Sequence, residues 1–149
     1  MRVFCQANTG KNLPDKLRHF HETDETAFSP LKIGDEYTVY GVMFLSDRVD
    51  YLVYPAIHDS NWIHGPHWMP GPLFKVLDAT LPSWQICLAE NQPDYQSLFA
   101  MFGITALIGY EELVSNPLHY NGILDRDPDE LQKFFVEKMK IDRWLREAE

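Results

Sequence analysis

Two runs of residues with strong β-strand preference lie close together in the first half of the chain, at 36–45 (EYTVYGVMFL) and 51–57 (YLVYPAI). Both are rich in β-branched and aromatic side chains, and only the segment 46–50 separates them. This pattern is typical of a β-hairpin. Because both faces of the first run are largely apolar, we expect a central strand covered on both sides, with a bend or bulge at Gly41. Pro55 restricts the end of the second strand to an edge or a terminus, since proline has no amide hydrogen to donate.

Three more strands are predicted at residues 2–7, 73–79 and 84–89, which carry alternating or continuous apolar residues between turn signals. Residues 95–108 are apolar without a clear period, a pattern that fits either a buried strand or a buried helix. We favour the strand there, because Gly103 is followed by β-branched residues.

Two segments are predicted to be loops. Residues 14–30 are polar and bounded by prolines, and we expect a long surface loop with at most one helical turn. Residues 58–72 are dense in glycine and proline, which predicts an irregular loop held in place by Trp62 and Trp68.

The last forty residues change to a helical pattern. A short helix is predicted at 110–115, ending near Asn116. Asp127 followed by Pro128 is a strong helix start, because aspartate accepts hydrogen bonds from the first amides and proline suits the first helical position. The helix that follows has one apolar stripe, formed by Leu131, Phe134, Phe135, Ile141 and Leu145.

These elements predict an α+β fold: a curved antiparallel β-sheet or partly open barrel of five to six strands, with C-terminal helices packed on it. We expect a single domain over residues 1–149, mainly β at 1–108 and helical at 109–149, since 149 residues suit one core. Cys5 and Cys87 lie in strand-like apolar contexts without metal-type spacing, so free buried thiols are expected.

The negative net charge of the chain argues against some classes of binding partner. Thirteen basic residues stand against 22 acidic ones, giving a formal net charge of -9, which repels nucleic acid and anionic membranes and attracts basic partners. No apolar run approaches the roughly 20 residues of a membrane span, and the first residues do not form a signal peptide. We therefore expect a cytoplasmic protein that binds neither nucleic acid nor membrane. The pattern makes no prediction about oligomeric state.

The histidine-rich segment is the main candidate for chemistry. His58, Asp59, His64 and His67 are four potential zinc ligands within ten residues. Their spacing matches no known mechanistic motif, and the chain has neither a GxSxG sequence nor a reactive-cysteine context. We therefore expect no cofactor and no catalytic residues, and we keep a small metal-dependent hydrolase using these four residues as an alternative.

The acidic residues are unevenly distributed. Residues 109–130 hold six acids against Arg126 alone, and residues 31–100 hold eight acids against three bases. Such regions could face a cationic partner.

Several segments resemble one family in order along the chain: FCQANTGKNLP (4–14), LKIGDEYTVYGV (31–42), PGPLFKVLDATLPSW (70–84) and GYEEL (109–113). They are similar to segments of small bacterial cytosolic proteins of unknown activity. Some of those proteins resemble the immunity partners of toxin–immunity gene pairs, including contact-dependent growth inhibition systems. The resemblance implies a non-enzymatic immunity protein that binds and neutralises a cognate toxin domain.

Combined with the charge, this resemblance indicates that the toxin domain is basic and nuclease-like, with acidic side chains substituting for substrate phosphates. The residues expected at the partner interface are the acids Asp47, Asp50, Asp59, Glu111 and Glu112 together with the aromatic Trp62. A further alternative is a barrel that binds a small ligand beside Trp62 and Trp68.

Overall fold

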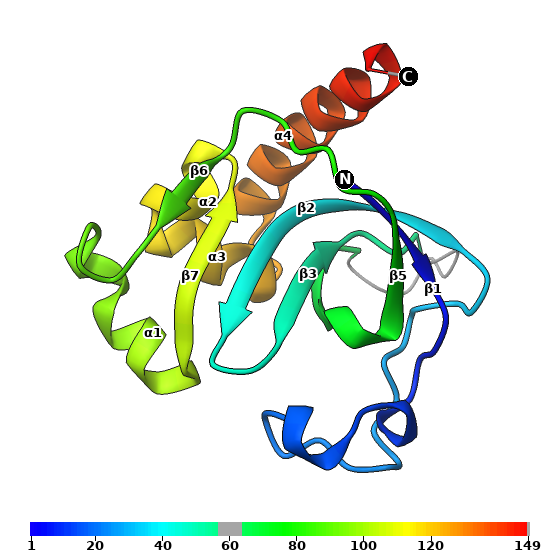
Figure 1. Cartoon of the computed structure of the whole chain (residues 1–149). Helices are drawn as coiled ribbons and strands as arrows, with labels where there is room; N and C mark the ends of the chain where they lie inside the picture. Colours follow the sequence, from blue (N-terminus) through cyan, green and yellow to red (C-terminus); the bar gives the residue numbers. More distant parts are fainter. Residues whose placement is uncertain (57–63, 149) are drawn as a thin grey trace.

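A computed structural model describes residues 1–56 and 64–148 (Figure 1). The strands are β1 (Arg2–Cys5), β2 (Glu36–Leu45), β3 (Val49–Val53), β4 (His67–Pro70), β5 (Phe74–Asp78), β6 (Gln85–Cys87) and β7 (Ile104–Gly109). The helices are α1 (Gln96–Phe102), α2 (Glu111–Ser115), α3 (Pro117–Leu124) and α4 (Pro128–Glu147). Short 3₁₀ turns occur at Gly10–Asn12, Asp15–Leu17, Gly71–Leu73 and Pro93–Tyr95. The expected α+β architecture is confirmed.

The seven described strands form one open antiparallel sheet around β2. Its order is β4-β3-β2-β1-β5, while β7 pairs with the second half of β2 and β6 pairs with β7. The predicted hairpin is β2 and β3, and their register shifts between Val39 and Gly41, which confirms the bulge. A Cβ on Gly41 would lie 2.7 Å from a methyl carbon of Leu113 in α2, so this close approach of helix and strand requires glycine.

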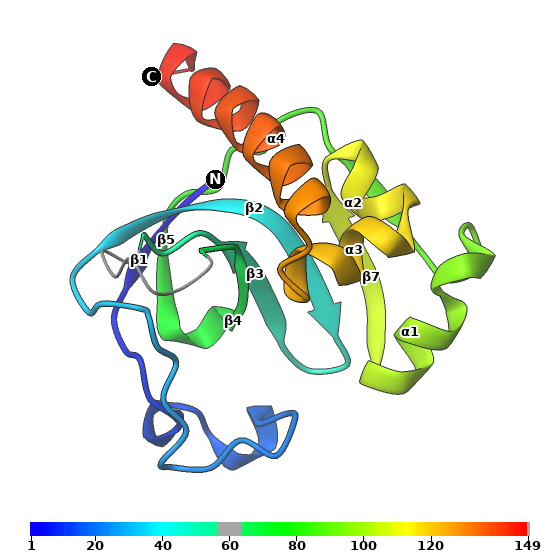
Figure 2. The ribbon, with the colours of Figure 1, turned by 180° about the vertical axis from the view of Figure 1, so that it is seen from behind.

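Helices α2, α3 and α4 cover one face of the sheet, and α4 crosses β2 there (Figure 2). The main core lies in this layer and includes Tyr95, Leu107, Phe134 and Ile123, all nearly inaccessible to solvent. A second apolar cluster fills the space between β1, β5 and the first half of β2. The long strand β2 contributes to both clusters, because both of its faces are apolar.

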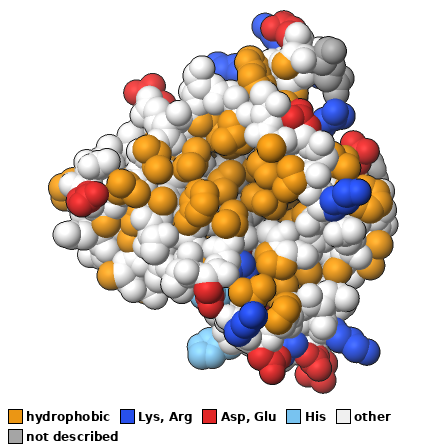
Figure 3. All heavy atoms as spheres, in the orientation of Figure 1, with side chains coloured by type: hydrophobic (Ala, Val, Ile, Leu, Met, Phe, Trp, Pro, Cys, Tyr) orange, Lys and Arg blue, Asp and Glu red, His pale blue; other side chains and the backbone are white. Residues whose placement is uncertain are grey.

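No helix of residues 1–56 and 64–148 lies over the opposite face of β6 and β7 (Figure 1). Apolar side chains gather on this face with few charged groups among them (Figure 3). Val76 and Leu77 of β5 and Ile86 of β6 are 41%, 44% and 54% exposed. An apolar surface of this kind is common at protein interfaces.

The expectations for two segments are corrected. Residues 95–108 are not one strand: α1 occupies Gln96–Phe102 and β7 begins at Ile104. Gly103 separates them with φ +65°, a left-handed conformation that ends the helix and favours glycine. Residues 58–72 are not all irregular, since β4 pairs with β3 and includes Trp68.

Helix α3 is absent from the sequence prediction, which placed only a helix end near Asn116. Helix α2 does end at Ser115, but the side chain of Asn116 also accepts a hydrogen bond from the amide of Leu118 at 3.0 Å. Pro117 then occupies the first position of α3. The same two residues therefore end one helix and begin the next.

Both cysteines are free and buried, as predicted. Burial raises the pKa of both thiols, with other contributions at Cys5. Within the described part of the chain, no helix is both long and apolar enough to cross a membrane.

Replacing Asp127 with alanine is expected to lower the free energy of unfolding by about 1 kcal/mol. Its carboxylate accepts hydrogen bonds from the amides of Asp129 and Glu130, at 3.0 and 3.1 Å, as the sequence predicted. Denaturant unfolding measures the loss, and Asp127→Asn is the control, because asparagine keeps the acceptor and should recover most of it. Equal losses in both variants would show that the charge of Asp127 stabilises α4 and its hydrogen bonds do not, and an unchanged stability of Asp127→Ala would contradict the prediction.

Candidate functional site

Acidic side chains from α2 and α4 surround a groove of about 660 Å³. Glu112 comes from α2, whereas Asp129, Glu130 and Glu137 come from the first half of α4. Lys133 is the only base that lines the groove among the described residues. The groove is thus strongly anionic.

A second hollow of about 380 Å³ adjoins the first at Glu137, which lines both. Glu111 adds another carboxylate here, and the half-buried Trp84 and Trp144 supply aromatic surface. We refer to the two hollows together as the acidic face, defined by the carboxylates of Glu111, Glu112, Asp129, Glu130 and Glu137.

Two lysines neutralise only part of the acidic face. Lys133 Nζ lies 2.9 Å from Glu130 and 3.6 Å from Glu112. Lys140 Nζ lies 2.6 Å from Glu137. Five carboxylates against two ammonium groups leave a formal charge of about -3.

Glu111 and Asp129 are exposed, and neither makes an ion pair within residues 1–56 and 64–148. Their carboxylates are therefore the ones most available to a cationic partner.

A buried chain of hydrogen bonds fixes the acidic face to the core. Tyr110 Oη lies 2.7 Å from His119 Nε2, and His119 Nδ1 lies 2.6 Å from a carboxylate oxygen of Glu130. His119 is fully buried, so one imidazole ties the residue that precedes α2 to α3 and α4. The hydrogen bonds that the Glu130 carboxylate accepts from Lys133 and from His119 lower the pKa of Glu130 despite partial burial. Burial raises the pKa of Tyr110, which keeps its hydroxyl protonated.

The residues predicted for partner binding separate into several places. Glu111 and Glu112 belong to the acidic face. Asp47 lies apart from it in the β2–β3 turn, 2.6 Å from His19 Nε2. Asp59 and Trp62 lie outside the described residues.

The expectation that Asp50 is a surface acid of the hairpin turn is wrong. Strand β3 begins at Val49, so Asp50 belongs to the strand and is only 2% exposed. It pairs with the buried guanidinium of Arg48, whose Nε lies 2.7 Å from Asp50 Oδ1. Burial raises the pKa of Asp50 although Arg48 opposes this.

The predicted metal ligands are only partly within the described residues, since His58 and Asp59 lie outside them. His67 is next to Arg126, whose Nη2 lies 3.1 Å from His67 Nε2. Burial and then this cation lower the pKa of His67 to about 4. A guanidinium so close opposes a metal ion at His67, and the described residues hold no group of three or more candidate ligands.

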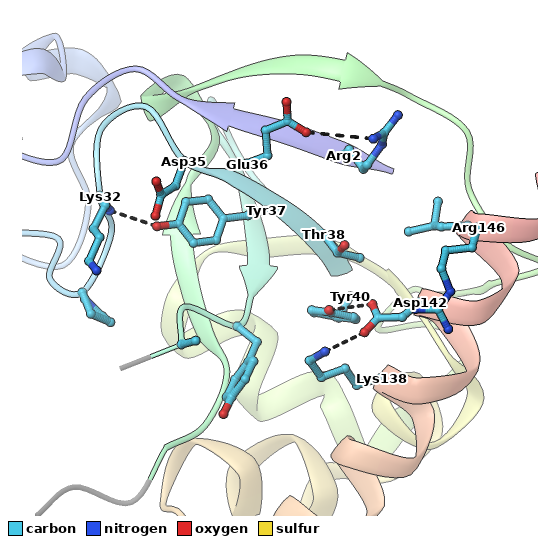
Figure 4. A pocket seen from close by; sticks show the side chains of 14 residues that line it. Arg2, Lys32, Asp35, Glu36, Tyr37, Thr38, Tyr40, Lys138, Asp142 and Arg146 are labelled. Atoms are coloured by element: carbon cyan, nitrogen blue, oxygen red, sulfur yellow. Dashed lines mark hydrogen bonds and ion pairs between the residues drawn. The ribbon is translucent and has the colours of Figure 1, made fainter. Parts of the chain in front are cut away.

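A third hollow, of about 590 Å³, lies between β1, β2 and the second half of α4 (Figure 4). In its wall, Asp142 accepts hydrogen bonds from Tyr40 Oη at 2.8 Å and from Lys138 Nζ at 2.6 Å. Lys138 also lies 5.5 Å from the ring of Tyr40 and 5.6 Å from that of Tyr54. These contacts fasten α4 to β2. Burial, together with Asp142, raises the pKa of Tyr40.

Four bases and three acids line this third hollow, so its charge is nearly balanced. Arg2 faces Glu36 at 3.9 Å, and Lys138 is paired with Asp142. The remaining charged residues of the lining are two bases, Lys32 and Arg146, and one acid, Asp35. The third hollow therefore lacks the strong single-sign field of the acidic face.

Of the acidic face, the sequence analysis named only Glu111 and Glu112 as interface residues. It missed Asp129, Glu130, Glu137 and the two tryptophans. The helical period could have identified part of this set, because residues 130, 133, 137, 140 and 144 follow one stripe of α4. Trp84 gave no such signal, since it lies just before β6 and reaches the face only through the tertiary fold.

Comparison of the chain with protein-family models, curated proteins and solved structures finds no match.

Proposed function

We propose that this protein is a non-enzymatic immunity protein that neutralises a basic, nuclease-like toxin domain by binding it through the acidic face. The observation that carries the proposal is the excess of carboxylates over lysines in the two adjoining hollows of α2 and α4. The partner class follows the resemblance of the sequence to immunity proteins.

Electrostatics supports this assignment. A nuclease must present a cationic surface to bind the phosphates of its substrate. Carboxylates gathered on one surface can occupy that site in place of the phosphates, and the overall charge of -9 favours encounter with it.

Aromatic and apolar surface supports a lasting complex. Trp84 and Trp144 line the acidic face, and tryptophan is frequent among residues that dominate binding energy. Strand β6 joins the acidic face to the uncovered apolar face of the sheet. Its residue Gln85 lines the acidic face, and the next residue, Ile86, is exposed on the apolar face. A partner could therefore contact charged and apolar surface around the edge strand β6.

The test is stopped-flow association with the toxin domain encoded by the neighbouring gene. Raising salt from about 50 to about 500 mM should slow association more than tenfold while changing dissociation little. The double variant Glu111→Gln/Asp129→Asn should slow association severalfold, because both carboxylates are exposed and neither makes an ion pair with another described residue. Trp144→Ala should mainly speed dissociation.

Glu25→Gln is the matched control, because Glu25 is an exposed acid on the segment before β2, far from α4 in sequence. It should leave both rates unchanged. The immunity proposal fails if the neighbouring toxin neither binds nor is neutralised. Binding with a salt-independent rate, or equal effects of the double variant and the control, would exclude the acidic face as its site.

A further inference from the structure

A fourth hollow, of about 410 Å³, lies apart from the acidic face and shares none of its residues. It lies between the segment before β2, strands β3 and β4, and helix α3. Five aromatic rings contribute to its wall: Phe20, Phe28, Trp68, Phe102 and Tyr120. Its size and its mainly apolar lining are those of small-ligand sites.

The charged side chains that line this hollow are acidic, and Asn121 adds a neutral amide. Glu22, Asp50 and Asp125 contribute carboxylates, and no lysine or arginine lines the hollow among the described residues. Arg48 binds Glu22 and Asp50 together, with its Nη1 2.6 Å from Glu22 and its Nε 2.7 Å from Asp50. Because the single guanidinium of Arg48 faces the two buried carboxylates of Glu22 and Asp50, this cluster keeps a formal charge of about -1. The exposed carboxylate of Asp125 adds a second negative charge.

The aromatic wall is held in a defined arrangement. Phe20 and His21 have φ of +55° and +62°, which bulky residues adopt only when the surrounding structure requires it. The ring of Phe20 meets that of Phe102 edge to face at 5.8 Å, although the two come from segments far apart in sequence. Trp68 stacks on Tyr120 at 6.1 Å.

We propose that this hollow binds an organic cation, an alkylammonium or guanidinium group with an apolar substituent. Aromatic faces attract such cations because of their quadrupole, most strongly where water is excluded. The carboxylates supply the opposite charge, and they disfavour anionic ligands of the same size. The cation can be a free small molecule or the side chain of another protein, since both present the same chemistry to the hollow.

Calorimetric titration with choline and with 3,3-dimethylbutan-1-ol isolates the role of charge. The two compounds have nearly the same shape, but only choline is charged. We expect choline to bind about tenfold more tightly or better. Nitrogen-15 NMR should place the binding at the indole Nε1–H of Trp68, and N-acetyl-arginine amide serves as the probe for a protein side chain.

Two variants on the rim test the site without disturbing its buried ion pairs. Phe102→Ala and Asp125→Asn should each weaken choline binding about threefold or more. Met101→Ala is the control for the ring, because Met101 precedes Phe102 in α1, is 74% exposed and does not line the hollow. Glu90→Gln is the control for charge, since Glu90 is an exposed acid away from the lining.

Each outcome decides the proposal. If choline binds more tightly than the alcohol and only the rim variants weaken its binding, the ligand is a free small cation. If the arginine compound binds and choline does not, the site is supported and its ligand is the side chain of another protein. The proposal is overturned if neither cation binds, if the neutral alcohol binds as well as choline, or if the controls weaken binding as much as the rim variants.

Discussion

Replacing Arg48 with methionine is expected to lower the free energy of unfolding by about 3–5 kcal/mol, because the variant leaves two buried carboxylates without their counter-charge. Arg48 makes hydrogen bonds to both oxygens of Asp50 and both oxygens of Glu22, and to the carbonyl of Leu17 at 3.0 Å. The side chain of Arg48 is fully buried. This one residue fastens the segment before β2 to strand β3.

The loss in Arg48→Met should depend on pH in a defined direction. Burial already raises the folded pKa of Asp50 above 3.8, and removal of Arg48 raises it further. Between pH 3.8 and the folded pKa of Asp50, the folded state binds more protons than the unfolded state. The free energy of unfolding of the variant therefore falls as the pH rises through this interval. Denaturant unfolding at neutral pH and at about pH 4.5 should show a smaller loss at the lower pH.

Arg48→Lys is the control for this prediction, because lysine keeps the charge but cannot reach both carboxylates with paired hydrogen bonds. It should recover part of the loss. A small, pH-independent loss in Arg48→Met would show that the cluster of Arg48, Glu22 and Asp50 is hydrated in solution.

Replacing His119 with alanine is expected to cost about 2–4 kcal/mol of unfolding free energy. The change removes a fully buried ring and leaves the hydroxyl of Tyr110 without its partner inside the core. The carboxylate of Glu130 also loses a 2.6 Å contact that holds it on the acidic face. Thermal and denaturant unfolding measure the loss.

Tyr110→Phe is the matched control, because it removes one hydrogen bond of the same chain and leaves the imidazole in place. It should cost about 1 kcal/mol. If His119→Ala costs no more than Tyr110→Phe, the imidazole does not join Tyr110, α3 and α4 in the way that the geometry indicates.

Features of the fold that depend on local chemistry could be predicted from the sequence. The β2–β3 hairpin follows from two β-rich runs with a short connection, and the bulge follows from Gly41. The start of α4 follows from Asp127 and Pro128, since a cap acts on amides two and three residues away. The buried stripe of α4 follows from its helical period.

Features that depend on distant partners could not be predicted in this way. The 95–108 segment divides into α1 and β7 because Gly103 caps a helix that packs on the core, and its apolar composition suits either state. Asp50 lies next to the connection between two strands, so the sequence predicts an exposed acid of the turn. In the fold it is buried and paired with Arg48. Arg48 also binds Glu22, which lies 26 residues away in the chain.

The candidate site shows the same division. The excess of acids, and the adjacent Glu111 and Glu112 at a helix start, can be read directly from the sequence. The packing of the helices is what brings them onto one surface with Asp129, Glu137, Trp84 and Trp144, while Asp47 lies elsewhere. The physical reason is that capping and periodicity act over a few residues, whereas the packing of α2 and α4 is decided by burial of side chains from the whole chain.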